Sequence, residues 1–131
     1  FTSLLKEVKD RNITLICTSG QLSVTAQLLI HKMAENGIRI YYSGDLDPEG
    51  ISICERLYEK YLDDIIPWRM DVTSYQACIS EEVISESRLS LLKSVKHPIL
   101  KETAIKMQSS QRAGYQENIL GLYLEDMLNI S

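Results

Sequence analysis

The sequence predicts an α/β fold, with a parallel sheet that carries helices on both faces and a helical C-terminal extension. Two observations predict this class. Short apolar runs alternate with segments of helical periodicity up to residue 71, and helical patterns dominate beyond it. Such alternation is typical of parallel strands joined by crossover helices. With 131 residues, 44% of them apolar, the chain suits one compact domain. We expect an α/β core over 1–71 and a helical extension over 72–131 packed on it.

The first half is expected to alternate helices with buried strands. Its expected order is helix 2–11, strand 13–17 (ITLIC), helix 22–36, strand 38–42 (IRIYY), helix 50–62 and a short strand within 64–70. The strand runs are short, apolar and rich in β-branched residues, which is typical of buried parallel strands. Asn36-Gly37 is a suitable helix end. The last strand must be short because Pro67 cannot occupy a central ladder.

The second half reads as helical. Helices are expected over 73–78, 87–93, 98–108 and 113–129. Pro98 is a favourable first-turn residue, and the last helix has a clear apolar stripe. Residues 80–90 are expected to form a flexible connection. No apolar run reaches the length that spans a bilayer, so no membrane partner is expected.

The stretch YYSGDLDPEG at 41–50 places three acidic residues, Asp45, Asp47 and Glu49, directly after the second strand. Ligands of open parallel sheets bind beyond the carboxyl ends of the strands. Residues i and i+2 of an extended segment point to the same side, so Asp45 and Asp47 are expected to present their carboxylates together. One or two carboxylates suffice to hold Mg²⁺, which commonly serves phosphate chemistry. The stretch therefore predicts a site for Mg²⁺ or Mn²⁺.

A simpler interpretation of the same stretch is a helix start. Asp47 is a suitable N-cap, Pro48 suits the first helical position, and Glu49 interacts favourably with the helix dipole. This interpretation leaves Asp45 unexplained. The two interpretations are compatible, and both stay open at this point.

Two further groups are candidates for phosphate contact. Ser19, Gly20 and Gln21 open a helix, where backbone N–H groups can hold a phosphate, although a plain cap is equally compatible. The net charge of −4 does not suggest a free-standing nucleic-acid binder. A basic strip near the C-terminal end is a candidate for DNA contact, with a solvated helix face as the alternative, and it consists of Lys93, Lys96, Lys101, Lys106 and Arg112. Arg69 is expected either to face phosphate or to form a salt bridge.

The stretch SGDLDPEG after a buried strand resembles the D-x-D motif of toprim domains, which occur in primases, topoisomerases and small nucleases. A longer resemblance covers most of the chain. The segments CTSGQLSVTAQLL, IRIYYSGDLDPEGISICERL, IIPWRMDVTSY and YQENILGLYLEDML resemble, in this order, the C-terminal domain of an uncharacterised bacterial family. That family is identified with the toprim-like subunit of Wadjet-type plasmid defence, which works beside an SMC-type ATPase complex.

The resemblance implies a metal-dependent DNA endonuclease in the cytoplasm, with DNA and the SMC-type complex as partners. Asp45 and Asp47 would hold Mg²⁺ or Mn²⁺, and Glu49 would assist catalysis. The toprim pattern also has a glutamate at the end of a first strand, for which the chain offers no candidate, so we expect the chain to begin just after it. A missing first strand would expose a sheet edge and favour a homodimer. A non-catalytic module that binds DNA or a partner is the alternative.

Overall fold

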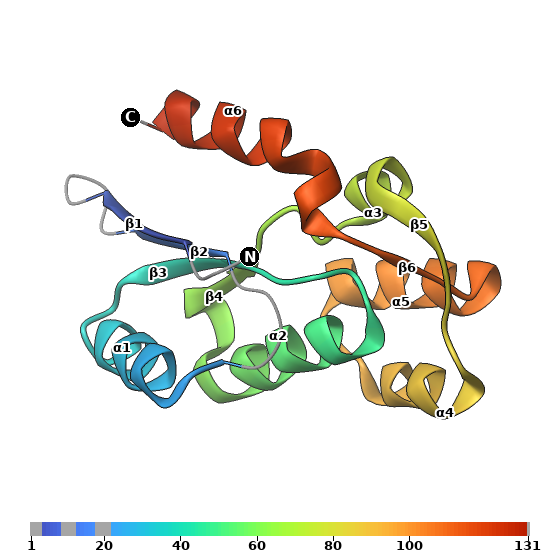
Figure 1. Cartoon of the computed structure of the whole chain (residues 1–131). Helices are drawn as coiled ribbons and strands as arrows, with labels where there is room; N and C mark the ends of the chain where they lie inside the picture. Colours follow the sequence, from blue (N-terminus) through green and yellow to red (C-terminus); the bar gives the residue numbers. More distant parts are fainter. Residues whose placement is uncertain (1–3, 9–12, 18–21, 131) are drawn as a thin grey trace.

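The computed structural model describes residues 4–8, 13–17 and 22–130 and contains a four-stranded sheet of order β1-β2-β3-β4 (Figure 1). Its strands are β1 (Leu4–Val8), β2 (Ile13–Cys17), β3 (Arg39–Ser43) and β4 (Ile65–Pro67). β2, β3 and β4 are parallel, and β1 is antiparallel to β2. The α/β class and the three parallel strands expected from the sequence are confirmed.

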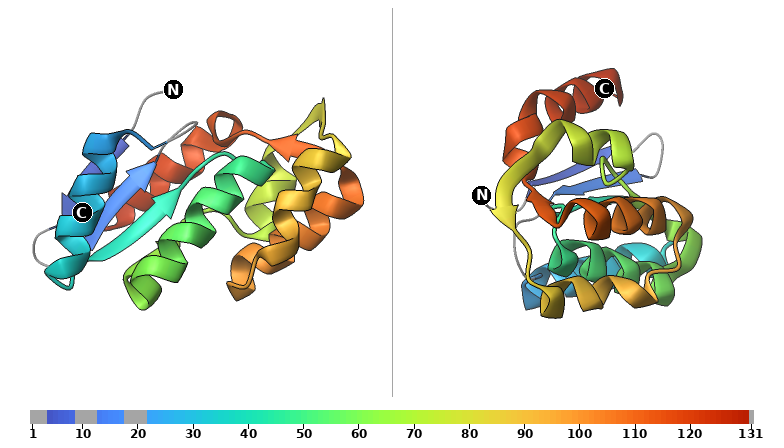
Figure 2. Two further views of the ribbon diagram at one scale, coloured as in Figure 1. Left: turned by 90° about the horizontal axis from the view of Figure 1, so that it is seen from below. Right: turned by 90° about the vertical axis from the view of Figure 1, so that its right-hand side faces the viewer.

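Helices α1 (Val24–Glu35) and α2 (Pro48–Tyr61) connect the parallel strands. The strand order β2-β3-β4 does not reverse, and crossovers between parallel strands are nearly always right-handed. The two crossover helices, α1 and α2, are therefore expected on the same face of the sheet. Figures 1 and 2 show α1 and α2 on one face and α6 (Leu120–Ile130) on the other. Of the described helices, none is long and apolar enough to cross a membrane.

The helix expected over residues 2–11 is wrong where the structure describes this range, because Leu4–Val8 form the strand β1. This strand pairs with β2, from Leu4 opposite Cys17 to Val8 opposite Ile13. An isolated helix of this length is marginal, and the ladder to β2 satisfies the same backbone groups. β1 also occupies the edge of β2 that was expected to be open. The argument for a homodimer through that edge therefore loses its basis.

The C-terminal half is not wholly helical. It contains a two-stranded antiparallel sheet of β5 (Ile79–Val83) and β6 (Arg112–Gly114). The helix expected over 113–129 was therefore placed too early: β6 and the 3-10 turn η4 (Gln116–Ile119) come first, and α6 begins at Leu120. The remaining helical elements are η2 (Leu62–Asp64), α3 (Val72–Cys78), α4 (Glu86–Leu89), η3 (Ser90–Ser94) and α5 (Pro98–Ser110).

The expectation of a flexible connection over 80–90 is also wrong, because this segment holds most of β5 and all of α4. The burial pattern of β5 shows why the sequence did not reveal it. Four of its five residues are exposed and the fifth is half-buried, so no apolar alternation marks the strand. Its partner β6 comes much later in the chain, beyond the reach of a local pattern.

Buried and half-buried polar contacts join the two halves of the chain. The buried Glu55 of α2 accepts a hydrogen bond from the backbone N–H of His97, which caps α5, at 3.0 Å. Arg69 lies just after β4 and forms a two-pronged ion pair with Asp126 of α6, with both N–O distances at 2.7 Å. Trp68 Nε1 donates to the same carboxylate at 2.8 Å. The salt-bridge interpretation of Arg69 is therefore confirmed.

The loop after β3 is fixed by a backbone bridge to β6. Leu46 N–H donates to the carbonyl oxygen of Gly114 at 2.8 Å, and Gly114 N–H donates back to the Leu46 carbonyl at 2.7 Å. A Cβ at position 114 would lie 2.7 Å from Cys78 Sγ and 3.2 Å from Tyr75 Cδ1, both of α3. The bridge therefore needs glycine at this position, where α3 and β6 pack closely.

We expect Gly114→Ala to lower the free energy of unfolding by about 1–3 kcal/mol, because the added methyl group overpacks the contact with Cys78 and pushes β6 away from Leu46. Gly121→Ala is the matched control, since a Cβ there meets nothing within 4 Å in α6. Alanine has the higher helix propensity, so the control should be neutral or stabilising by up to about 1 kcal/mol. Urea unfolding of both variants tests this, and equal stability of the two would contradict it.

Candidate functional site

The acidic stretch after β3 forms the wall of a small pocket. Leu46 is fully buried and held to Gly114, and in this extended segment its neighbours Asp45 and Asp47 point to the opposite side. The pocket has a volume of about 230 Å³ and is lined by Tyr42, Gly44, Asp45, Asp47, Glu49, Gly50 and Ile53. All three acidic residues singled out in the sequence therefore meet at the carboxyl end of a central parallel strand.

The helix-start interpretation of the stretch is confirmed. Asp47 is the N-cap of α2, and its Oδ1 accepts a hydrogen bond from Gly50 N–H at 2.7 Å. Pro48 is the first helical residue, and Glu49 lies in the first turn. A Cβ at position 50 would lie 2.0 Å from the carbonyl oxygen of Asp45, so only glycine lets α2 begin against that carbonyl.

A cation that the sequence analysis missed faces the acidic pocket. Arg88 of α4 binds the Glu49 carboxylate, with Nη2 2.6 Å from Oε1 and Nε 3.2 Å from each carboxylate oxygen. The same Nη2 lies 3.9 Å from Asp47 Oδ2. The hydrogen bonds from Arg88 lower the pKa of Glu49. No local signal links the two residues, because they lie 39 positions apart and Arg88 falls in the segment expected to be flexible.

Asp47 has the opposite electrostatic environment. Burial is the main reason that the pKa of its carboxyl is raised from 3.8 to about 6, and the negative charges of Glu49 and Asp45 contribute in the same direction. The hydrogen bond from Gly50 and the charge of Arg88 act in the other direction but do not cancel the effect. At neutral pH the pocket therefore holds a carboxylate whose charge is poorly solvated, which is a favourable position for a cationic ligand.

The donor chemistry of Asp45 and Asp47 fits a hard divalent cation. Mg²⁺ binds through one or two carboxylates and keeps several waters, so two aspartates on one wall of a small pocket are sufficient. Glu49 is engaged by Arg88 and contributes mainly negative charge. Within the described part of the chain, no three His, Cys, Asp or Glu side chains form a group that could hold a metal ion. A cation bound here would accordingly be shared with water or with substrate oxygens.

Of the other predicted contact residues, those that the structure describes do not line this pocket. Ser19, Gly20 and Gln21 lie outside the described residues. Lys93, Lys96, Lys101 and Lys106 are exposed, and Arg112 Nη1 donates to the Glu81 carbonyl at 2.7 Å. Lys101 and Lys106 are five residues apart on α5, about 140° around the axis, so they flank its buried stripe on opposite sides. The structure does not gather these two lysines on one face.

Comparison with known proteins places the chain in a family. Residues 1–127 match the family described as Protein of unknown function C-terminus (DUF2399), and the chain belongs to it. The chain is also similar to the Wadjet protein JetD of Bacillus cereus (strain Q1), with 26% identity over 121 residues. That match covers 86% of this chain but only 30% of JetD. No solved structure matches the chain significantly. The resemblance to an uncharacterised, Wadjet-related family is thereby confirmed.

We expect Asp47→Asn to stabilise the protein at pH 7 by about 1–3 kcal/mol, because asparagine keeps the N-cap while removing a charge that is costly to bury. The folded-state pKa of Asp47 is raised to about 6, so the folded state binds more protons than the unfolded state between pH 4 and 6. Wild-type stability therefore falls as pH rises through this window, and the variant lacks that loss.

Urea unfolding of both proteins between pH 4 and 7 measures this difference. The advantage of Asp47→Asn should grow with pH and become small near pH 4, where the wild-type carboxyl is protonated in the folded state and partly protonated in the unfolded state. Asp63→Asn, at an exposed position, serves as the matched control and should change stability little. A variant no more stable than wild type at pH 7 would contradict the assignment of a buried, destabilising charge to Asp47.

Proposed function

We propose that this chain is the toprim-like part of a Wadjet defence protein and that it takes part in metal-dependent hydrolysis of DNA phosphodiester bonds. The proposal rests chiefly on one observation: Asp45 and Asp47, two residues apart, line one pocket at the carboxyl end of a central parallel strand. The similarity to JetD over 86% of the chain supports the placement in Wadjet defence. Because the chain spans about 30% of that protein, activity is proposed for the full-length protein.

Asp45 and Asp47 would hold Mg²⁺ or Mn²⁺ through their carboxylate oxygens. A bound divalent cation polarises a phosphoryl oxygen and activates water, which is the chemistry that phosphodiester hydrolysis needs. Water attacks phosphorus, the bond to the leaving sugar oxygen breaks, and that oxygen takes a proton. The backbone bridge at Leu46 keeps the loop between the two aspartates fixed. Positions held by backbone hydrogen bonds suit a site that must hold charges at set distances.

Arg88 and Glu49 complete the proposed site. The guanidinium holds Glu49 at the pocket wall and lies 3.9 Å from Asp47 Oδ2, so a positive charge lies beside the two aspartates. A planar guanidinium is well suited to binding a phosphate group. The proposed partners are DNA and an SMC-type ATPase complex, in the cytoplasm. The similarity to the Wadjet protein JetD supports this part of the proposal.

A non-catalytic module that binds DNA or a partner is the second candidate function. One observation favours it: Arg88 binds the Glu49 carboxylate at 2.6 Å, so Glu49 is not available as a ligand for a cation. Such a module would bind DNA through phosphate contacts, and its affinity would fall steeply with salt. It would not need a divalent cation to bind.

A plasmid-nicking assay tests the proposal. It uses supercoiled plasmid, Mn²⁺ and the full-length protein together with its SMC-type partner complex. Asp45→Asn should reduce cleavage by more than the roughly 10–100-fold cost of losing a group that merely supports a metal ligand. Asp63→Asn carries the same chemical change at an exposed position and should cleave like wild type. Equal cleavage by Asp45→Asn and wild type would refute the assignment of the site. Salt-sensitive binding without cleavage by any of the three proteins would favour the binding module.

A further inference from the structure

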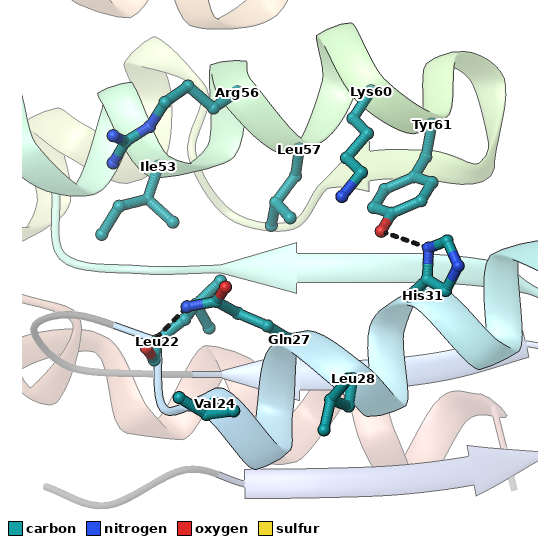
Figure 3. A pocket seen from close by; sticks show the side chains of 10 residues that line it. All are labelled: Leu22, Val24, Gln27, Leu28, His31, Ile53, Arg56, Leu57, Lys60 and Tyr61. Carbon is teal, nitrogen blue, oxygen red and sulfur yellow. Dashed lines mark hydrogen bonds between the residues drawn. The ribbon is translucent and has the colours of Figure 1, made fainter.

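A groove of about 580 Å³ lies between α1 and α2 (Figure 3). These two helices cover the face of the sheet opposite α6 (Figure 1). Ten residues line it: Leu22, Val24, Gln27, Leu28, His31, Ile53, Arg56, Leu57, Lys60 and Tyr61. Figure 3 shows the two helices running in the same direction, with side chains from both pointing into the space between them. The groove is separate from the aspartates of the acidic pocket, although Ile53 lines both.

Two rows of apolar side chains run along the groove. Val24 and Leu28 lie one helical turn apart on α1, and Ile53 and Leu57 have the same spacing on α2. Val24 and Leu28 are 73% and 65% exposed, although the opposite side of α1 is buried in the core through Ile30 and Met33. Rows of this spacing on two neighbouring helices match the anchor spacing of an amphipathic helix that binds in a groove. The shape therefore favours an elongated helical occupant.

The charged residues that line the groove are basic. Among the described residues, its lining includes Arg56, Lys60 and His31 but no acidic residue, although the chain as a whole has a net charge of −4. Glu35 lies at one end, where it contacts His31 Nε2 at 2.8 Å, and His31 Nδ1 lies 3.0 Å from the Tyr61 hydroxyl. The positive charge along the open groove is therefore that of Arg56 and Lys60, which both project from exposed positions on α2.

We propose that this groove binds an acidic amphipathic helix of a protein partner. The apolar rows would pack against leucine or other large apolar side chains of that helix, and Arg56 and Lys60 would face its carboxylates. DNA is disfavoured, because most protein hydrogen bonds to DNA go to phosphate and sugar, whereas apolar side chains, the exposed Val24 and Leu28 among them, line this groove. The inference is independent of whether the acidic pocket binds a metal.

A second copy of the chain is the strongest competing occupant. Helix α6 has no basic residue and exposes Leu120, Leu124 and Leu128 in one row. However, α6 and the groove lie on opposite faces of the sheet, so binding of one copy's α6 in the next copy's groove repeats head to tail. Such contacts generate open chains of copies unless the rotation closes. A separate partner avoids this outcome.

Fluorescence anisotropy of a labelled peptide with the full-length protein tests the proposal. The probe is a 14-residue helix-forming peptide with leucines spaced to share one face and glutamates elsewhere. Its control has the same composition in scrambled order. The probe should bind at least about tenfold more tightly than the scrambled peptide, and Arg56→Glu/Lys60→Glu should remove about tenfold of that affinity by turning two attractions into repulsions. A probe in which lysines replace the glutamates should recover binding to this double variant.

Matched control variants distinguish binding of the probe in the groove from a general effect of the protein's charge. Lys101→Glu/Lys106→Glu makes the same charge change on α5 and should leave probe affinity unchanged, whereas Leu28→Asp should abolish binding. Leu28, Arg56 and Lys60 are exposed, so melting temperatures near that of wild type are expected for the variants. Equal binding of the ordered and scrambled probes overturns the proposal. Displacement of the probe by duplex DNA overturns it in favour of nucleic acid, and self-association that Leu124→Asp abolishes overturns it in favour of a second copy.

Discussion

The pair of backbone hydrogen bonds between Leu46 and Gly114 is the constraint on which the rest of the structure depends. It joins the loop after β3 to β6, and so connects the parallel sheet to the antiparallel pair of the C-terminal half. Because Leu46 is buried and bridged, the side chains on either side of it are directed together into one pocket. The close approach of Gly50 to the Asp45 carbonyl then fixes where α2 begins. The same backbone contacts therefore fix both the connection between the two sheets and the geometry of the pocket.

The electrostatics of the pocket follow from that geometry. A rigid loop holds Asp45, Asp47 and Glu49 near one another, and Arg88 offsets the charge of Glu49 most directly. Asp47 keeps a raised pKa because it is buried and its acidic neighbours add to the cost of its charge. A folded protein that accepts such a cost commonly does so at a functional site, where a ligand offsets it. In the function proposed above, the pair of aspartates and the arginine beside them would present both signs of charge to a phosphate-bearing ligand and its cation.

The parts of the fold and of the site that depend on residues close together in the sequence were predictable from the sequence. The strands 13–17 and 38–42, the helix that follows each of them, and the cap at Asp47 all have local patterns of period, propensity or turn composition. The acidic trio was predictable because one short stretch contains it. β5, β6 and the contact of Arg88 with Glu49 were not, because each is defined by partners distant in the chain. Within the helix expected over residues 2–11, the helical pattern of residues 4–8 was overridden in the same way, by pairing of β1 with β2.

The central claim, that a fixed loop holds a divalent cation between Asp45 and Asp47, is tested most directly by the effect of Mn²⁺ on backbone amide NMR signals. Mn²⁺ is paramagnetic and broadens the signals of nearby amides. At low Mn²⁺ concentration, our account predicts that the amides of Leu46, Gly50 and Gly114 broaden first, and that Asp45→Asn abolishes this selectivity. Broadening that instead centres on other acidic segments, such as Glu81–Glu82, or that is unchanged in Asp45→Asn, would contradict it.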